Sequence, residues 1–238
     1  NAVTMTDPLK APVDPAALSA LLAERRSVRG FKPDAIADDE LHALFTDAQR
    51  APSWCNIQPW RIALTKPPFT QRLTDALLHA ANTSLPASEL PFLVDYPPPY
   101  REHRRACGGA LYQAMEIARD DKAGRHAAWL RNFACFDAPH VAVVSVERAL
   151  GPYAYLDVGV WLGYLFAAAA ARGISTCAMA SIATYPEVLR RELGIPESQT
   201  ILFGIAIGYE DPTVSANQCR TTREPIAANI QWFAEPSK

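Results

Sequence analysis

The feature that most constrains the fold of this 238-residue chain is one apolar segment, VGVWLGYLFAAAAA, between Asp157 and Arg172. Its fourteen residues are too few to span a bilayer as a helix, which takes about 20 residues. A helix that is apolar on every side has to be covered by protein instead. In a chain of this size, the segment is therefore expected to be a central core helix or the helix of a subunit interface.

The residues around this segment predict a mixture of helices and strands. Apolar residues at helical spacing, with Asp14 and Asp38 as N-caps, predict helices over 16–26, 39–50, 69–81, 100–121, 124–134 and 186–193. Short β-branched runs predict strands over 60–65, 140–146, 174–179 and 200–208. These elements do not follow a strict strand–helix–strand repeat, so an α+β fold of layered sheet and helices is expected. We expect residues 1–13 to form a tail and residues 14–238 to form a single domain.

Composition and charge argue against several kinds of partner. The chain is 49% hydrophobic and 20% charged, as globular proteins are, and its net charge of -2 gives no reason to expect a nucleic acid or an anionic membrane surface. The five cysteines and five histidines are scattered, with no C-x-x-C or H-E-x-x-H, so neither a metal site nor a disulfide framework is expected. Scattered thiols, and no charged-then-apolar leader, favour a cytoplasmic protein.

Two arginine clusters are candidate phosphate-binding elements. RRSVR, residues 25–29, has three arginines around a serine, and RTTR, residues 220–223, has two arginines around two threonines. Guanidinium groups match phosphate geometry and stay charged, while hydroxyl groups add donors. Taken singly, each cluster also fits a solvated basic helix end or a surface loop. The chain has no glycine-rich phosphate loop, so side chains would have to hold any bound phosphate.

Two further stretches are unusual for simple connections. APSWCNIQPWR, residues 51–61, places two tryptophans, a thiol and two side-chain amides between a helix and a strand. Cys55 has no histidine near it in sequence, so a packed or bystander thiol is favoured over a nucleophile. Residues 86–100 contain five prolines, which predicts a stiff surface excursion of the kind that often lies beside a site. CGGAL, residues 107–111, is interpreted as a close-packing glycine pair rather than a ligand loop.

In combination and in this order, RRSVRGF, AQRAPSWCNIQPWR, GISTCAMASIATYPEVLRRELGIP, ILFGIAIGYED and RTTREPI resemble the flavin-dependent nitroreductase family. The resemblance covers roughly residues 18–232. It implies one FMN-binding domain that forms an intertwined α+β homodimer, with two FMN sites at the subunit interface. On this view the long apolar helix, 154–172, is the buried interface helix.

The resemblance also implies which residues of the two clusters hold the flavin. Arg25, Arg26 and Ser27 match the family's first phosphate- and ribityl-binding element. Arg29 matches the position that faces the N1–O2 edge of the flavin, where a cation stabilises the negative charge of the reduced ring. Arg223 matches the late phosphate-contacting arginine.

The resemblance assigns two other segments to the surroundings of the flavin ring. The first is the segment that one subunit sends to the other's flavin, with Pro52, Ser53 and Asn56 against the ring and ribityl chain. The second passes the N5 edge with its backbone, and consists of Ala178, Met179, Ala180 and Ser181. Some members have Glu-Gly at the last two positions, so a carboxylate role is lost here while backbone donation to N5 is kept. A lysine often found beside the late arginine is replaced by Thr221, and Arg220 is expected to compensate.

The implied activity is FMN-dependent reduction of nitroaromatics or quinones by NAD(P)H in a ping-pong mechanism, without a side-chain general acid or base. The flavin N5 atom carries the hydride, and the partners are a second copy of the chain and a small aromatic acceptor. Phe92, Tyr96 and Tyr100 are expected either to shape the acceptor pocket or to pack within a surface loop. Two alternatives remain at this point: another flavin reaction on the same fold, namely reductive dehalogenation or flavin breakdown, and a non-catalytic flavin-binding dimer.

Overall fold

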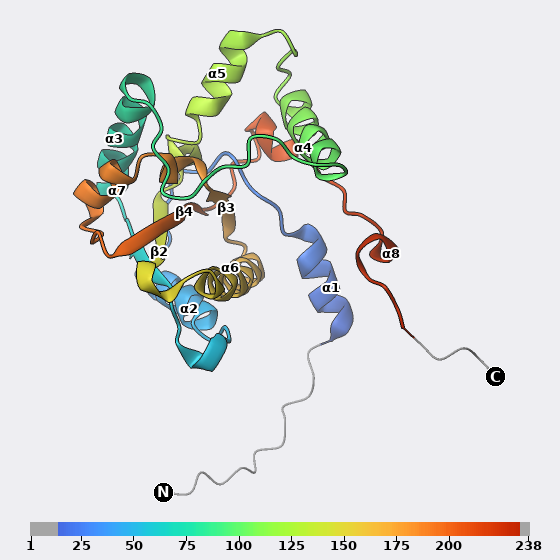
Figure 1. The fold of residues 1–238 in the computed structure, drawn as a ribbon. Coiled ribbons are helices and arrows are strands. Elements are labelled where there is room, and N and C mark those ends of the chain that lie inside the picture. The colour runs from blue at the N-terminus through green and yellow to red at the C-terminus, as the bar shows by residue number, and fades with distance from the viewer. Residues whose placement is uncertain (1–13, 234–238) are drawn as a thin grey trace, which may run out of the picture.

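A four-stranded antiparallel sheet lies at the centre of the computed structural model, which describes residues 14–233 (Figure 1). Its strands, in spatial order, are β1 (Arg61–Leu64), β2 (His140–Glu147), β4 (Gln199–Gly208) and β3 (Ser175–Met179). All four predicted strands are thus confirmed to within one residue at each end. The predicted tail, residues 1–13, lies outside the described residues.

The two inner strands are apolar on both faces, because helices cover both faces of the sheet. In β2, Val141 and Val143 contribute to one core cluster, and Val144 and Val146 contribute to the other. The pairing of β2 with β4 shifts register between Val144 and Ser145, which marks a bulge. The predicted layered α+β fold is therefore confirmed.

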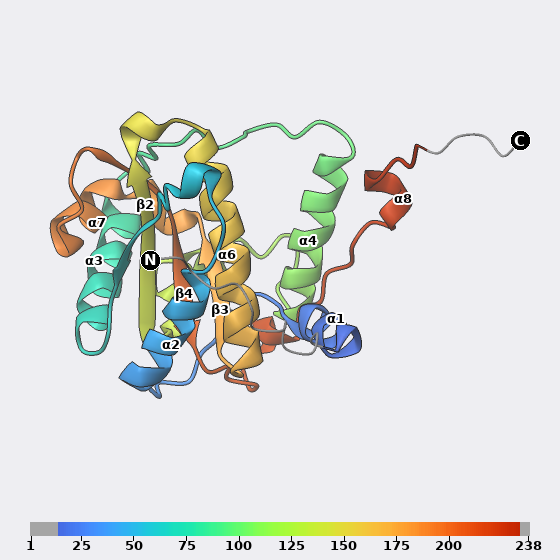
Figure 2. The ribbon, with the colours of Figure 1, turned by 90° about the horizontal axis from the view of Figure 1, so that it is seen from below.

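Helices form a layer on each face of the sheet (Figures 1 and 2). On one face lie α3 (Phe69–Thr83) and α7 (Pro186–Leu193), which bury Leu73, Leu77 and Leu189. On the other face lie α2 (Asp38–Ala48) and α6 (Tyr153–Ala171), which bury Leu44, Trp161 and Leu165. Each core cluster thus contains one face of the sheet and the apolar side of two helices.

The long apolar helix, α6, is covered by this chain on one side only. Its bounds agree within one residue at each end with the predicted helix 154–172, and Asp157 lies inside it with its side chain buried. Among the described residues, α6 is long and apolar enough to cross a membrane by length and composition alone, but it packs on the sheet and 33% of its most apolar window is buried. The opposite side exposes Leu156, Val160 and Tyr164. The alternative of a central core helix, covered on every side by its own chain, is therefore wrong.

Four further helices lie outside these two layers: α1 (Pro15–Glu24), α4 (Tyr100–Ala114), α5 (Lys122–Leu130) and α8 (Ile226–Asn229). None of these four has a buried residue. The predicted helices over 100–121 and 124–134 end earlier than expected, at Ala114 and Leu130. Figure 2 shows α8, and the segment that leads to it, extending away from the rest of the molecule.

The two predicted N-caps differ in outcome. The Asp14 carboxylate accepts a hydrogen bond of 2.9 Å from the backbone N–H of Ala16, so this cap is confirmed. Asp38 is instead the first residue of α2, after Ala37 at the cap position. The predicted cap was wrong by one residue, but a carboxylate in the first turn still complements the helix dipole.

A buried histidine joins three segments at the start of β2. His140 Nε2 accepts a hydrogen bond of 2.9 Å from the backbone N–H of Ile36, and Nδ1 lies 3.3 Å from the carbonyl oxygen of Thr65. These partners fit a neutral ring with its proton on Nδ1. Burial lowers the pKa of His140 below its usual value, against the raising effect of the Thr65 contact.

Candidate functional site

The two arginine clusters, from opposite ends of the described chain, line the same cleft. The cleft has a volume of about 490 Å³ and lies between the end of α1, the segment 219–223 and one face of α4. The arginines that line it are Arg25, Arg26, Arg29, Arg220 and Arg223, with Ser27 among them. Glu24 is the one carboxylate in its lining. The cleft therefore has a strong excess of positive charge, which suits an anionic ligand.

A buried asparagine ties the two clusters together. Asn217 is 1% exposed, and its carboxamide oxygen accepts a hydrogen bond of 2.6 Å from the backbone N–H of Arg29. Its side-chain amide nitrogen donates to the backbone carbonyl oxygens of Gly30 at 2.9 Å and Asp211 at 2.8 Å. The backbone carbonyl oxygen of Asn217 accepts a hydrogen bond of 2.8 Å from the Arg220 guanidinium. Sequence analysis missed Asn217, because nothing in the spacing of NQCRTTR indicates a partner near residue 29.

The first arginine segment is also fixed against the sheet. Val28 donates its backbone N–H to the Thr176 carbonyl at 3.1 Å, and Ser27 forms a parallel bridge with Thr176. Residues 27–29 therefore run alongside the outer strand β3. This contact brings the cleft next to the segment that begins at Ala178.

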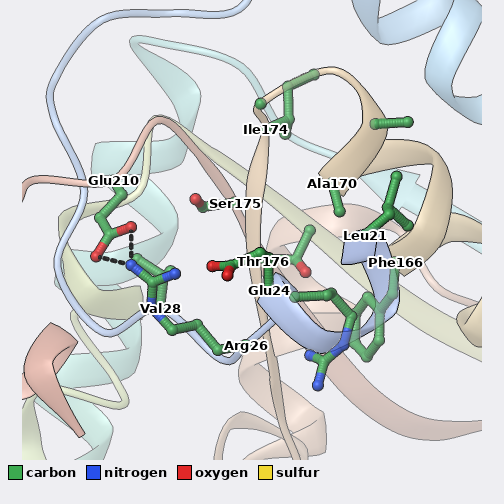
Figure 3. A pocket seen from close by; sticks show the side chains of 13 residues that line it. Leu21, Glu24, Arg26, Val28, Phe166, Ala170, Ile174, Ser175, Thr176 and Glu210 are labelled. Atoms are coloured by element: carbon green, nitrogen blue, oxygen red, sulfur yellow. Dashed lines mark hydrogen bonds and ion pairs between the residues drawn. The ribbon is translucent and has the colours of Figure 1, made fainter. Parts of the chain in front are cut away.

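The five arginines of the cleft are not equivalent. Arg26 Nη2 donates to both carboxylate oxygens of Glu210, at 2.7 and 2.5 Å. Figure 3 shows this pair in a neighbouring pocket of about 400 Å³, opposite Phe166 and Ile174. Within residues 14–233 the other four arginines form no ion pair. They are the cations that remain available to an anionic ligand.

Helix α4 contributes an unexpected wall to the cleft. Cys107 and Leu111 of α4 line it together with Cys219, and none of these was predicted. Burial raises the pKa of the Cys219 thiol, which keeps it protonated at neutral pH. Among the described atoms, a Cβ added at Gly108 or Gly109 would meet nothing within 4 Å, so the interpretation of CGGAL as a close-packing pair is wrong for the single chain.

The four residues predicted for the flavin N5 edge follow one another at the end of β3. Ala178 and Ala180 are exposed there, while Met179 is 2% exposed. The Met179 side chain therefore belongs to the core, and only its backbone can face a ligand. Ser181 begins a short 3-10 turn, and its hydroxyl oxygen is buried without a hydrogen-bond partner among the described residues.

The segment with Pro52, Ser53 and Asn56 lies away from this cleft in the single chain. Trp54 packs edge-on against Tyr153, at the start of α6, with ring centroids 4.8 Å apart. The pocket beside Arg26 instead adjoins Phe166 and Ala170, near the other end of the same helix. Tyr153 and Phe166 are 13 residues apart in α6, which corresponds to roughly 20 Å along the helix axis. One chain thus does not bring this segment to the arginine clusters.

The proline-rich segment 86–100 is anchored at its base and exposed beyond it. The Glu89 carboxylate accepts hydrogen bonds from Arg190 at 2.6 Å, Arg148 at 2.7 Å and the backbone N–H of Ile201 at 2.9 Å. Burial alone would raise the pKa of Glu89, but these hydrogen bonds outweigh it and lower the pKa. The rest of the segment follows as a loop on the surface.

Of the three aromatic residues predicted for the acceptor pocket, Phe92 and Tyr96 lie on this loop and Tyr100 begins α4. None of them lines the arginine cleft in the described chain. Phe92 and Tyr100 are exposed, and Tyr96 is partly covered by the Arg104 guanidinium, 5.3 Å from its ring centroid.

No group of three or more histidine, cysteine, aspartate or glutamate residues within 14–233 is arranged to hold a metal ion.

The fold is α+β, and its arginine-lined cleft has the charge and the donors that suit an anionic ligand. The chain belongs to the nitroreductase family, whose model matches residues 22–209. It is 34% identical to a 4-nitrobenzoate reductase of Pseudomonas putida over 207 residues, covering 86% of this chain and 90% of that protein. It is 32% identical to the nitroreductase NfnB of Mycolicibacterium smegmatis over 225 residues, covering 91% and 92%.

Solved structures agree with this family. The FMN-dependent nitroreductase NfnB from Mycobacterium smegmatis, solved in complex with NADPH, superposes with a TM-score of 0.89 at 30% identity and covers 93% of this chain and 100% of that one. The FMN- and NADPH-dependent NfnB from a Sphigopyxis strain has a TM-score of 0.88 at 32% identity, covering 91% and 99%. The expected family, fold class and class of enzyme are confirmed.

Proposed function

We propose that this protein is an FMN-dependent NAD(P)H oxidoreductase that reduces nitroaromatic compounds. The observation that carries the proposal is the cleft in which arginines from both ends of the chain meet without a glycine-rich loop. Two of its relatives are 4-nitrobenzoate reductases, which supports a nitroaromatic acceptor. Quinones are a second class of acceptor that we include in the proposal.

The donors of the cleft fit the phosphate and ribityl groups of FMN. Arg25, Ser27 and Arg223 would hold the phosphate, because guanidinium and hydroxyl donors match its oxygens. Arg29 would face the N1–O2 edge and stabilise negative charge there. Arg220 would supply further positive charge, whereas Arg26 is largely neutralised by Glu210 and would act through the backbone around it.

The rest of the flavin site requires a second copy of the chain. The outer side of α6 leaves Leu156, Val160 and Tyr164 uncovered, and the C-terminal segment leaves Trp232 and Phe233 76% and 87% exposed. Burial of such surface is the main driving force of obligate dimers. In an intertwined homodimer, the segment with Pro52, Ser53 and Asn56 would reach the other subunit's flavin.

The chain's own residues would bind and orient, while bound FMN would supply hydride chemistry at its N5 atom. The backbone at Ala178–Ser181 would donate hydrogen bonds at that edge, and the aromatic residues of loop 86–100 would border the open face. NAD(P)H and the acceptor would occupy the same place in turn, as a ping-pong mechanism requires. Five free cysteines support the proposed cytoplasmic setting.

One experiment tests this function directly. The purified protein is mixed with FMN, desalted, and its visible spectrum is recorded before and after anaerobic addition of NADPH or NADH. We expect a bound flavin spectrum that bleaches with the nucleotide and returns when 4-nitrobenzoate is added. A colourless protein that takes up no FMN would overturn the proposal, and bleaching without reoxidation by nitroaromatics or quinones would restrict it to another flavin reaction.

A further inference from the structure

A buried carboxylate lies in the middle of the most apolar helix of the molecule. Asp157 of α6 is 9% exposed, and its Oδ1 accepts a hydrogen bond of 3.1 Å from the backbone N–H of Trp54. Its Oδ2 is buried and has no partner among the residues that the structure describes. A buried carboxylate with one hydrogen bond is costly, and a hydrophobic side chain of the same size would serve the core better. Stability therefore does not explain this residue.

The segment that Asp157 contacts has an unfavourable backbone conformation. Cys55, Asn56 and Gln58 have φ values of 47°, 56° and 47°, and none of them is glycine. Left-handed backbone at such residues carries a cost and persists only where the surroundings hold it. Residues 53–58 therefore need external support to keep this shape.

Only part of that support comes from within the segment. Ser53 Oγ accepts a hydrogen bond of 2.9 Å from the Gln58 N–H, which closes the turn on itself. At its tip, the segment contacts α6 through Trp54. The Asp157 carboxylate accepts a hydrogen bond from the Trp54 backbone N–H, and the Tyr153 ring packs edge-on against the Trp54 ring. Tyr153 and Asp157 are one helical turn apart, so the two contacts act on the same side of the helix.

We propose that Asp157 is a positioning residue. Its buried carboxylate lowers the stability of the core, but it holds residues 53–58 in the conformation that includes the left-handed Cys55, Asn56 and Gln58. This step stands on the structure of the chain alone. Its consequence for the cofactor rests on the proposed function: because Ser53 and Asn56 would contact the other subunit's flavin, loss of the Asp157 anchor would misplace both and weaken FMN binding.

The sharpest test is a substitution that should improve the core and loosen the segment. Asp157→Leu fills the same space and removes the buried charge, so we expect an unchanged or higher melting temperature. The Trp54 N–H loses its acceptor, so hydrogen exchange of the peptide 51–60, followed by mass spectrometry on the FMN-free protein, should become about tenfold to a hundredfold faster. A residue with a merely structural role would lower the melting temperature as exchange rises.

Two further variants serve as rescue and as control. Asp157→Asn keeps an oxygen that can accept from Trp54, so slow exchange of 51–60 should return. Val158→Ala removes volume from the next buried position of α6 without touching that hydrogen bond, and it should lower the melting temperature while leaving exchange of 51–60 unchanged. The proposal would be overturned if residues 51–60 exchanged as slowly in Asp157→Leu as in the wild type. It would also be overturned if Asp157→Asn exchanged as fast as Asp157→Leu.

The cofactor consequence has its own measurement. FMN titration should show a Kd about tenfold weaker for Asp157→Leu and near the wild-type value for Asp157→Asn. Faster exchange with an unchanged Kd would refute the link to the flavin and keep the anchor. A wild-type protein that binds no FMN would refute the proposed function, while the exchange experiment would still decide whether Asp157 positions the segment.

Discussion

Replacing Arg223 by alanine should weaken FMN binding without damaging the fold. Within the described residues, Arg223 makes only local hydrogen bonds, to the Thr221 hydroxyl at 3.0 Å and the Thr222 carbonyl at 2.9 Å, and forms no ion pair. Its loss therefore leaves no buried charge behind. A hydrogen bond between charged groups is worth about 1.5–3 kcal/mol, or roughly a tenfold to hundredfold change in Kd. Because Arg223 is exposed and screened by water and salt, we expect the lower end, about tenfold.

The assay is titration of the apo protein with FMN by flavin fluorescence, at two salt concentrations. Arg223→Ala should weaken binding most at low salt and reduce its salt dependence, since one fewer cation meets the phosphate. Arg223→Lys keeps the charge but loses the planar fork, so its Kd should lie between the two. Arg119→Ala is the matched control, because it removes the same charge from an exposed arginine outside the cleft. An unchanged Kd in Arg223→Ala, or an equal loss in Arg119→Ala, would refute the reasoning.

Three further predictions concern the dimer, the pH dependence of stability and the loop. Leu156→Glu or Val160→Glu, on the exposed side of α6, should convert the dimer to a monomer, as measured by light scattering. A wild-type protein that is a stable, flavin-loaded monomer at micromolar concentration would contradict this. Because burial lowers the pKa of His140, the unfolded chain binds a proton first as pH falls, so the free energy of unfolding should decrease below about pH 6.5 and be unaffected by this group above it. Denaturant unfolding from pH 5 to 8 tests this, and a His140→Gln variant with the same pH dependence as the wild type would rule out this histidine as the cause. Phe92→Ala or Tyr96→Ala should change relative kcat/KM among nitroaromatics and quinones at constant FMN content; loss of flavin with unaltered acceptor preference would place the loop in cofactor binding or folding.

Local sequence patterns were sufficient to predict the four strands and the longer helices of the fold. β2 and β4 are continuous apolar runs because both of their faces are covered, so they could be recognised without knowing their partners. α7 begins at Pro186 and ends at Leu193 before Gly194 in a left-handed conformation, as its sequence predicts. The predicted ends failed for α4 and α5, which stop at Ala114 and Leu130 and have no buried residue, so no packed core marks where they end.

The candidate site divides in the same way between sequence and tertiary structure. Arginine clusters and the order of motifs were visible in the sequence, because residue type and spacing are local properties. Which arginines remain without a carboxylate was decided only by folding, since Glu210 reaches Arg26 and Asn217 reaches Arg29 across most of the chain. The Trp54–Asp157 contact likewise joins residues that no periodicity connects. Hydrogen bonds and ion pairs depend on distances between atoms, and the sequence determines those distances only through the packing of the whole fold.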